Sequence, residues 1–179
     1  MKNKYAMKYI YPVSVFLLLV SPAFAGESYK DRQLFMAKSF LNKAETYMRE
    51  GAFFRSRSYY LRAYRKFTSA GDPGGQFHSL KGLGDLNMRR GYIDRAFDMY
   101  NRARYFAYQG GQVYTSMYVD LCRNVARVHE HHKYYQNAVE YMKIAVQIGG
   151  RIGDGLHQQD VAFIAKLTAL YQKHGAVGR

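Results

Sequence analysis

The segment with the most groups able to do chemistry is His129-Glu130-His131-His132. On a helix, His129 and His132 would share one face, because they are three residues apart, and they could then ligate a metal ion. Zinc takes further ligands at definite spacings, however, and the H-E-x-x-H pattern of zinc peptidases is absent. We therefore predict a buried, structural role for His129, with neither a metal site nor a bound cofactor.

The sequence offers no recognisable catalytic nucleophile. Cys122 is the single cysteine, and no histidine and Asn or Asp follow it at spacings typical of thiol enzymes. The G-x-S-x-G and S-x-x-K motifs are absent, and Gly82-x-Gly84 lies inside a helical pattern rather than in a phosphate-binding loop. We predict an inert, buried thiol and a protein that is not an enzyme; a small enzyme with an unrecognised site is the least favoured hypothesis.

The composition indicates one globular, helical and strongly basic domain. The chain has 179 residues, and 27 Lys and Arg stand against 13 Asp and Glu, which gives a formal net charge of +14. Its hydrophobic content of 48% is that of a folded protein rather than a disordered one. Only three prolines occur, which favours long helices over a turn-rich β fold.

The first 25 residues have the layout of a secretory signal peptide. Lys2, Lys4 and Lys8 precede an uncharged run over 9–24, and Ala23-Phe24-Ala25 fits the small-x-small cleavage rule. We expect cleavage after Ala25, export to the periplasm or beyond, and a mature domain over 26–179 that is not an integral membrane protein. Retention of the segment as a membrane anchor is the alternative.

The rest of the chain repeats itself with a period of 40–42 residues. A shift of 42 residues aligns small and apolar positions: Leu83 with Val125, Gly84 with Ala126, Ala96 with Ala138 and Ala103 with Ala145. A shift of 40 residues in the other direction aligns Gly91 with Gly51, Gly84 with Ala44, Tyr100 with Tyr60 and Ala103 with Ala63. Such fixed-period similarity is typical of solenoid proteins.

Seven helices are expected, near 29–50, 53–69, 75–90, 93–108, 113–132, 134–148 and 156–174. Ser28 with Asp31 predicts a capping box, and Asp94 and Asp154 are predicted N-caps. Gly51, Gly91 and Gly175 match the left-handed position at which the first helix of a repeat should end. The third repeat has Lys133 there instead, and its positive charge complements the helix dipole. Gly84 and Ala96 are predicted to face each other, because two helices approach closely only where small residues meet.

The middle repeat carries Leu80-x2-Leu83-Gly84-x2-Asn87 followed by Ala96-x3-Tyr100-x2-Ala103. This pattern resembles that of the tetratricopeptide repeat (TPR) family, in a subclass with repeats of 40–42 residues. The resemblance implies an all-α fold, an α-solenoid of about three and a half helix-turn-helix repeats in a right-handed superhelix. The repeats would lie near 37–72, 77–112 and 119–154, with a capping helix over 156–174. It also implies a binding or scaffolding protein with a concave groove lined by the first helix of each repeat.

Family geometry places a set of charged and polar residues on that concave face. They are Lys38, Leu41 and Glu45 in the first repeat, His78, Lys81, Asp85 and Arg89 in the second, and Asp120, Arg123, Asn124 and Arg127 in the third. Basic residues outnumber acidic ones, so an extended peptide with acidic groups, or a carboxyl terminus, is the expected partner. A solvated face of mixed charge is the alternative.

A second basic feature is the stripe of Arg55, Arg62 and Lys66 on one side of the helix expected over 53–69. It suits an anionic envelope surface, such as lipid headgroups or an acidic glycan; the secretory address argues against nucleic acid as the partner. The leading hypothesis is an exported TPR-like adaptor that helps to assemble or stabilise a cell-envelope complex, such as a secretion, pilus or polymer-export machine. A basic module that binds an anionic surface or polymer is the alternative.

Overall fold

The computed structural model describes residues 28–154 and 157–175, and this part of the chain contains seven α-helices and no β-strand. The helices are α1 (Tyr29–Arg49), α2 (Phe53–Ala70), α3 (Pro73–Arg89), α4 (Ile93–Gln109), α5 (Ser116–His131), α6 (Tyr135–Ile152) and α7 (His157–Gly175). The predicted all-α class is confirmed. The predicted signal peptide and its cleavage site lie outside the described residues.

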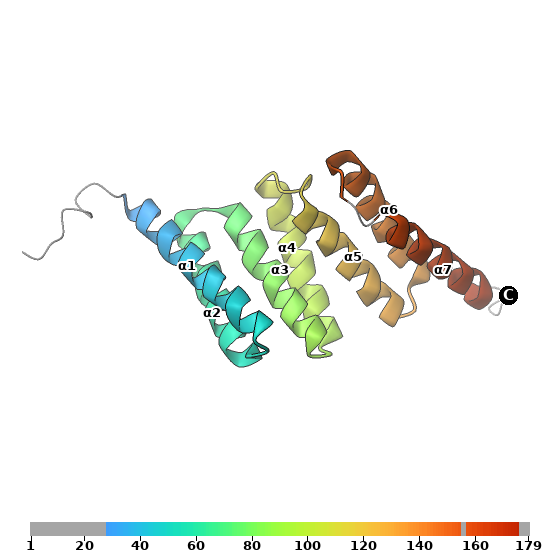
Figure 1. Cartoon of the computed structure of the whole chain (residues 1–179), viewed down its shortest axis with the longest axis horizontal. Coiled ribbons are helices and arrows are strands. Elements are labelled where there is room, and N and C mark those ends of the chain that lie inside the picture. Colours follow the sequence, from blue (N-terminus) through green and yellow to red (C-terminus); the bar gives the residue numbers. More distant parts are fainter. Residues whose placement is uncertain (1–27, 155–156, 176–179) are drawn as a thin grey trace, which may run out of the picture.

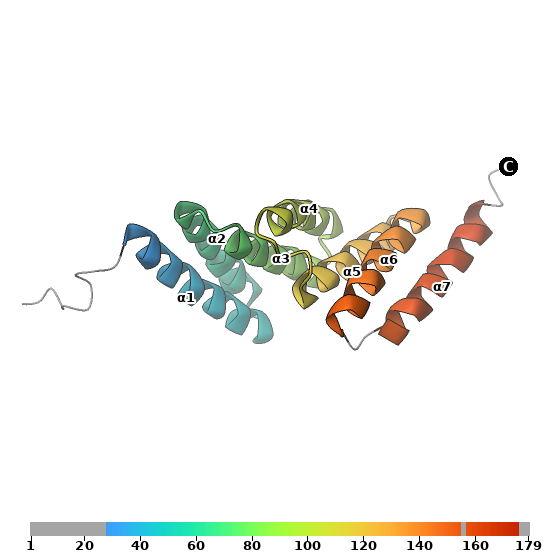
Figure 2. The ribbon, with the colours of Figure 1, turned by 90° about the horizontal axis from the view of Figure 1, so that it is seen from above.

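The helices pack in successive antiparallel pairs, as expected for an α-solenoid. The most extensive contacts join α1 to α2, α3 to α4 and α5 to α6, while α7 packs on α6. Figure 1 shows the pairs as a row, with α1 and α7 at its two ends, and Figure 2 shows the same row from above. Each pair contacts the next through α2 with α3 and through α4 with α5, so side chains of neighbouring repeats meet at these junctions.

The turns within the repeats have the predicted geometry. Gly51 and Gly91 have φ of 73° and 75°, and Lys133, which takes their place in the third repeat, has φ of 62°. Lys133 is the only non-glycine residue with positive φ among those described. A left-handed residue is therefore built into all three turns, even where no glycine supplies it.

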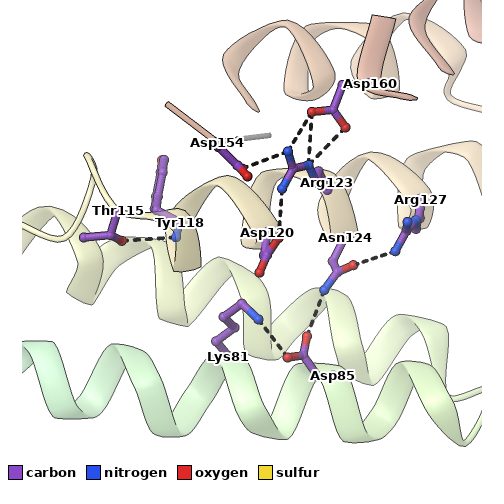
Figure 3. A network of polar contacts seen from close by, with 10 residues as sticks. All are labelled: Lys81, Asp85, Thr115, Tyr118, Asp120, Arg123, Asn124, Arg127, Asp154 and Asp160. Carbon is purple, nitrogen blue, oxygen red and sulfur yellow. Dashed lines mark hydrogen bonds and ion pairs between the residues drawn. The ribbon is translucent and has the colours of Figure 1, made fainter. Parts of the chain in front are cut away.

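The predicted cap of α1 is confirmed and that of α4 is wrong. Ser28 and Asp31 form the capping box of α1. Asp94 does not cap α4, which begins after Tyr92 without a side-chain cap, and the Asp94 carboxylate lies 3.1 Å from Nε2 of His132. Asp154 lies 2.9 Å from Arg123, and the residues that join it to α7 lie outside the described part of the chain. The caps missed by sequence reasoning are Asp72 on α3 and Thr115 on α5, the latter visible in Figure 3.

The third repeat also departs from the predicted boundaries. Gly149 and Gly150, predicted to form a turn, lie inside α6, which continues to Ile152 and ends at the left-handed Gly153. Gly149 is buried, but a Cβ added to it would lie 3.5 Å from Asp154 Cβ and 3.8 Å from a Val119 methyl carbon, which are ordinary van der Waals contacts. The two glycines are therefore part of the helix, and the chain leaves α6 at Gly153 instead.

Glycines of α3 accept aromatic rings from the flanking helices. A Cβ added to Gly84 would lie 2.3 Å from a ring carbon of Tyr100, and one added to Gly82 would lie 2.3 Å from the ring of Tyr60. The atoms nearest to Gly84 thus belong to Tyr100, one turn further along α4 than the predicted partner Ala96. These contacts fix how closely α2 and α4 pack on α3.

Candidate functional site

The predicted groove residues belong to α1, α3 and α5, and most of them bond to one another. Asp85 on α3 is the centre of this network (Figure 3). Its carboxylate accepts hydrogen bonds from Lys81 Nζ at 2.9 Å, from Tyr100 Oη at 2.8 Å and from Asn124 Nδ2 at 2.9 Å. The last of these bonds joins α3 to α5 and therefore connects the second repeat to the third.

The same network continues along α5 and has an electrostatic consequence for Tyr100. Asn124 uses its amide oxygen to accept a hydrogen bond from Arg127 Nη1 at 3.1 Å. Burial, together with the charge of Asp85, raises the pKa of Tyr100 far above its ordinary value, so this hydroxyl stays protonated and keeps donating. Asp85 is thus surrounded by donors from three helices.

Arg123 is the centre of a second, buried cluster that ties α7 to α5 (Figure 3). Its side chain is only 8% exposed, and it donates to both carboxylate oxygens of Asp160 at 2.8–3.1 Å. It also donates to Asp120 at 3.0 Å and lies 2.9 Å from the Asp154 carboxylate. The hydrogen bonds to Asp160 raise the pKa of Arg123 despite its burial.

This cluster changes the role assigned to Arg123. Its guanidinium is enclosed by three carboxylates of its own chain, so its charge is compensated within the fold rather than left for a partner. Asp154 and Asp160 were missed by sequence reasoning. No local signal connects them to Arg123, because Asp160 is separated from it by 37 positions and by the whole of α6.

The first repeat is joined to the second by Glu45 and His78. Glu45 Oε1 lies 3.3 Å from His78 Nε2, which links α1 to α3. Burial lowers the pKa of His78, and the nearby Glu45 only partly opposes this shift, so a neutral imidazole that donates its Nε2 hydrogen fits the pair at neutral pH. Glu45, Asp85 and Asp120 all therefore have partners within the chain.

Three cations of the predicted groove have no such carboxylate partner. Lys38 on α1, Arg89 on α3 and Arg127 on α5 are exposed, and none forms an ion pair with an acid among the described residues. A hollow of about 320 Å³ adjoins Lys38, with Leu41, Phe67 and Phe77 in its lining. The face formed by α1, α3 and α5 thus pairs its acids internally and leaves positive charge for a ligand.

The predicted stripe on α2 lies against aromatic rings of the first helix pair. The Arg55 guanidinium is 5.7 Å from the Tyr47 ring centre, and that of Arg62 is 4.7 Å from the centre of Phe40. Lys66 is half-buried. The arginines thus flank an aromatic group at the α1 end of the row, where Phe35 and Phe54 are 72% and 79% exposed.

The residues first considered for chemistry are part of the core. His129 is buried, its ring stacked on Tyr141 and edge-on to Phe97, and burial lowers its pKa. Cys122 is also buried, and burial raises the pKa of its thiol to about 12. Both structural roles agree with prediction. Across residues 28–154 and 157–175, no three His, Cys, Asp or Glu side chains converge as a metal site would require.

The helical pairs define the class of fold: an α-solenoid-like helical repeat. A solved structure with a similar fold is that of BtubC (BKLC) from P. vanneervenii, with a TM-score of 0.60 and 20% sequence identity over 83% of this chain and 68% of that one. At this identity the likeness shows the fold alone. No family profile and no curated protein sequence matches the chain.

Proposed function

We propose that the protein is an exported, TPR-like adaptor that binds an acidic peptide segment of a partner protein along α1, α3 and α5. One observation carries this proposal: on this face the acids are bonded internally, whereas Lys38, Arg89 and Arg127 keep exposed charges without an acidic partner among the described residues. One cation comes from each of three successive first helices. A peptide that crosses these helices would meet them in turn.

The internal network supports recognition because it holds these cations on a fixed frame. The Asp85–Asn124 bond joins α3 to α5, and the Glu45–His78 pair joins α1 to α3. A binding face that is already ordered loses less conformational entropy when the ligand docks. Pairing of Asp85 with Lys81 also reduces the repulsion that an approaching carboxylate would otherwise meet.

The sequence supplies the cellular setting of the proposal. The signal-like layout over 1–25 favours export, and an adaptor in that compartment would assemble or stabilise an envelope complex. Of the helices in the described residues, none has the length and apolar character needed to cross a bilayer. In this proposal the protein acts in the periplasm or outside the cell as a binding module.

The test uses site-specific cross-linking in cells. A photo-crosslinking residue replaces the exposed Asn42, one helical turn from Lys38, and the adduct is identified by mass spectrometry. The triple variant Lys38→Glu, Arg89→Glu, Arg127→Glu should lose the adduct and keep its helical circular dichroism. The charge-matched control Lys30→Glu, Arg32→Glu, Arg65→Glu, also exposed, should keep it. Equal adduct yields in the two triple variants would remove the basis of the proposal.

The alternative, binding to an anionic envelope surface, is favoured by one observation of its own. Exposed Phe35 and Phe54 lie at the same end of the row as Arg55 and Arg62, and aromatic and basic side chains together suit a membrane interface. Flotation with vesicles of anionic lipid tests it. Binding that weakens steeply with salt, and that is lost in Arg55→Glu, Arg62→Glu, Lys66→Glu, supports the alternative.

A further inference from the structure

A hollow on the molecule is lined by α2, α3 and α4, away from the residues assigned to the proposed peptide face. Its volume is about 300 Å³, which is at the lower end of ligand-binding pockets. Buried Leu80 and Leu83 of α3 contribute its apolar floor, while Leu61 of α2 and Met99 of α4 contribute to its walls. An apolar side chain of a ligand would be removed from water here and would contact an apolar surface, which is favourable.

Three arginines surround this hollow, and their charge is largely uncompensated. Arg57 comes from α2, and Arg95 and Arg102 come from α4; all three are exposed. One acid, Asp98, also lines the hollow. Among the described residues, no carboxylate lies within ion-pair distance of any of the three guanidinium groups. The hollow thus combines an apolar floor with a net positive rim.

Tyrosines hold two of these arginines in place without cancelling their charge. The Arg102 guanidinium lies 5.6 Å from the ring centre of Tyr64, and its Nη2 is 3.3 Å from the Tyr64 hydroxyl. The Arg95 guanidinium lies 5.2 Å from the ring centre of Tyr92. Stacking occupies the face of a guanidinium and leaves N–H groups at its edge for a ligand.

We propose that this hollow is a second docking site, which binds a peptide segment with an apolar side chain flanked by carboxylates. The apolar side chain would contact Leu80 and Leu83, and the carboxylates would accept hydrogen bonds from Arg57 and Arg102. The Asn87 side chain, also in the lining, offers both a donor and an acceptor to the peptide backbone. This site is independent of the α1, α3 and α5 face and serves as a separate contact with a partner protein.

The shape and the charge together favour a peptide over a lipid surface or a polyanion. The apolar residues lie at the bottom of a hollow between two helices, where a flat bilayer surface cannot reach them. A polysaccharide with acidic groups but no apolar part would leave Leu80 and Leu83 uncovered. An apolar side chain that projects from an acidic peptide segment would cover the leucines of the floor, while the carboxylates beside it would pair with the arginines of the rim.

The test is a fluorescence-anisotropy titration of the purified protein with a labelled peptide in which Phe-Leu is flanked on both sides by Asp and Glu. The variant Arg57→Glu, Arg102→Glu should bind at least about tenfold more weakly than the wild type. The charge-matched control Lys30→Glu, Arg32→Glu should stay within about twofold. A second peptide, with Ala-Ala in place of Phe-Leu, should also bind about tenfold more weakly. Thermal melting followed by circular dichroism checks that all variants are folded.

The outcomes separate this site from the proposed peptide face. Because the acidic flanks of the peptide could also bind the face of α1, α3 and α5, the titration is repeated in the Lys38→Glu, Arg89→Glu, Arg127→Glu background. There Arg57→Glu, Arg102→Glu should still weaken binding of the Phe-Leu peptide about tenfold. If the triple variant alone loses binding while Arg57→Glu, Arg102→Glu alone keeps it, the second site is overturned and the first is supported. Equal losses in the hollow variant and its control, or equal affinity for both peptides, also overturn it. The second site is also overturned if the protein binds anionic vesicles through Arg57 and Arg102 but binds neither peptide.

Discussion

The face made by α1, α3 and α5 and the hollow between α2 and α4 use their charged residues in opposite ways. On the first face, Asp85 and the acids around Arg123 bond to side chains of neighbouring helices. Around the hollow, Arg95 and Arg102 lie on tyrosine rings and meet no carboxylate among the described residues. The first arrangement joins repeats to one another, while the second leaves charge available at the surface.

The physical origin of this difference is the depth at which the charges lie. Arg123 and Asp160 are both buried, so an unpaired charge there would be costly and must be compensated within the chain. Arg57, Arg95 and Arg102 are exposed to water, which solvates them without a partner. Substitutions should therefore lower stability strongly on the face made by α1, α3 and α5, here called the network side, and weakly around the hollow.

The largest effect is expected for Arg123→Ala. It leaves Asp160, buried on α7, and the half-buried Asp154 without their cation, and removal of one partner from a buried ion pair costs about 3–5 kcal/mol. Chemical denaturation measures the loss in unfolding free energy. The control is Arg127→Ala, four residues further along α5 but exposed, which should change stability little. Similar stabilities of the two variants would show that the cluster does not hold α7.

A smaller but clear loss is expected for Gly84→Ala. The added methyl group would lie 2.3 Å from the Tyr100 ring, so the ring must move away from the position that brings its hydroxyl to Asp85. Overpacking of this kind typically costs about 1–3 kcal/mol. Gly150→Ala is the matched control, since nothing lies within 4 Å of its added methyl group in α6. Gly150→Ala should be neutral or stabilising, because alanine favours helices.

The next largest effect is expected at alkaline pH, which should lower the free energy of unfolding through Tyr100. The pKa of Tyr100 is raised in the folded state, so above about pH 10 the unfolded chain ionises this tyrosine while the folded protein does not. Its contribution is complete below about pH 10 and falls by up to about 1.4 kcal/mol per pH unit above it. Denaturation curves between about pH 9 and pH 11 should give a shallower decline for Tyr100→Phe. If the stabilities of the wild type and of Tyr100→Phe declined equally with pH, Tyr100 would not be the group responsible.

Much of the fold could be predicted from the sequence because its signals are local or strictly periodic. The spacing of small residues located the helix pairs, and the repeat alignment placed Lys133 at the position of Gly51 and Gly91, where its φ is 62°. His129 and Cys122 were recognised as core residues because each falls at a large apolar or aromatic position of the repeat. Periodicity places a residue on a face of a helix, and this was sufficient to assign His129 and Cys122 to the core.

Periodicity could not predict which charges pair, because pairing depends on contacts between distant segments. Asp160 reaches Arg123 only through the packing of α7, so Arg123 was assigned to a partner rather than to the chain itself. The hollow was missed for the same reason: Arg57 and Arg102 belong to different repeats and line it from different helices. The helix face of each charged residue was predictable, but its neighbour across the helix junction was not.

The smallest effect on stability should come from the arginines around the hollow. Arg95→Ala and Arg102→Ala each remove a cation–aromatic contact at an exposed position, which is worth about 0.5–1 kcal/mol. Neither substitution leaves a buried charge behind, because no carboxylate of the described residues depends on these arginines. Chemical denaturation should therefore show small losses, largely retained in high salt, since a ring is screened less than an ion pair. A loss as large as that of Arg123→Ala would mean that the hollow, like the network side, holds repeats together, and its arginines would then be structural rather than available for a ligand.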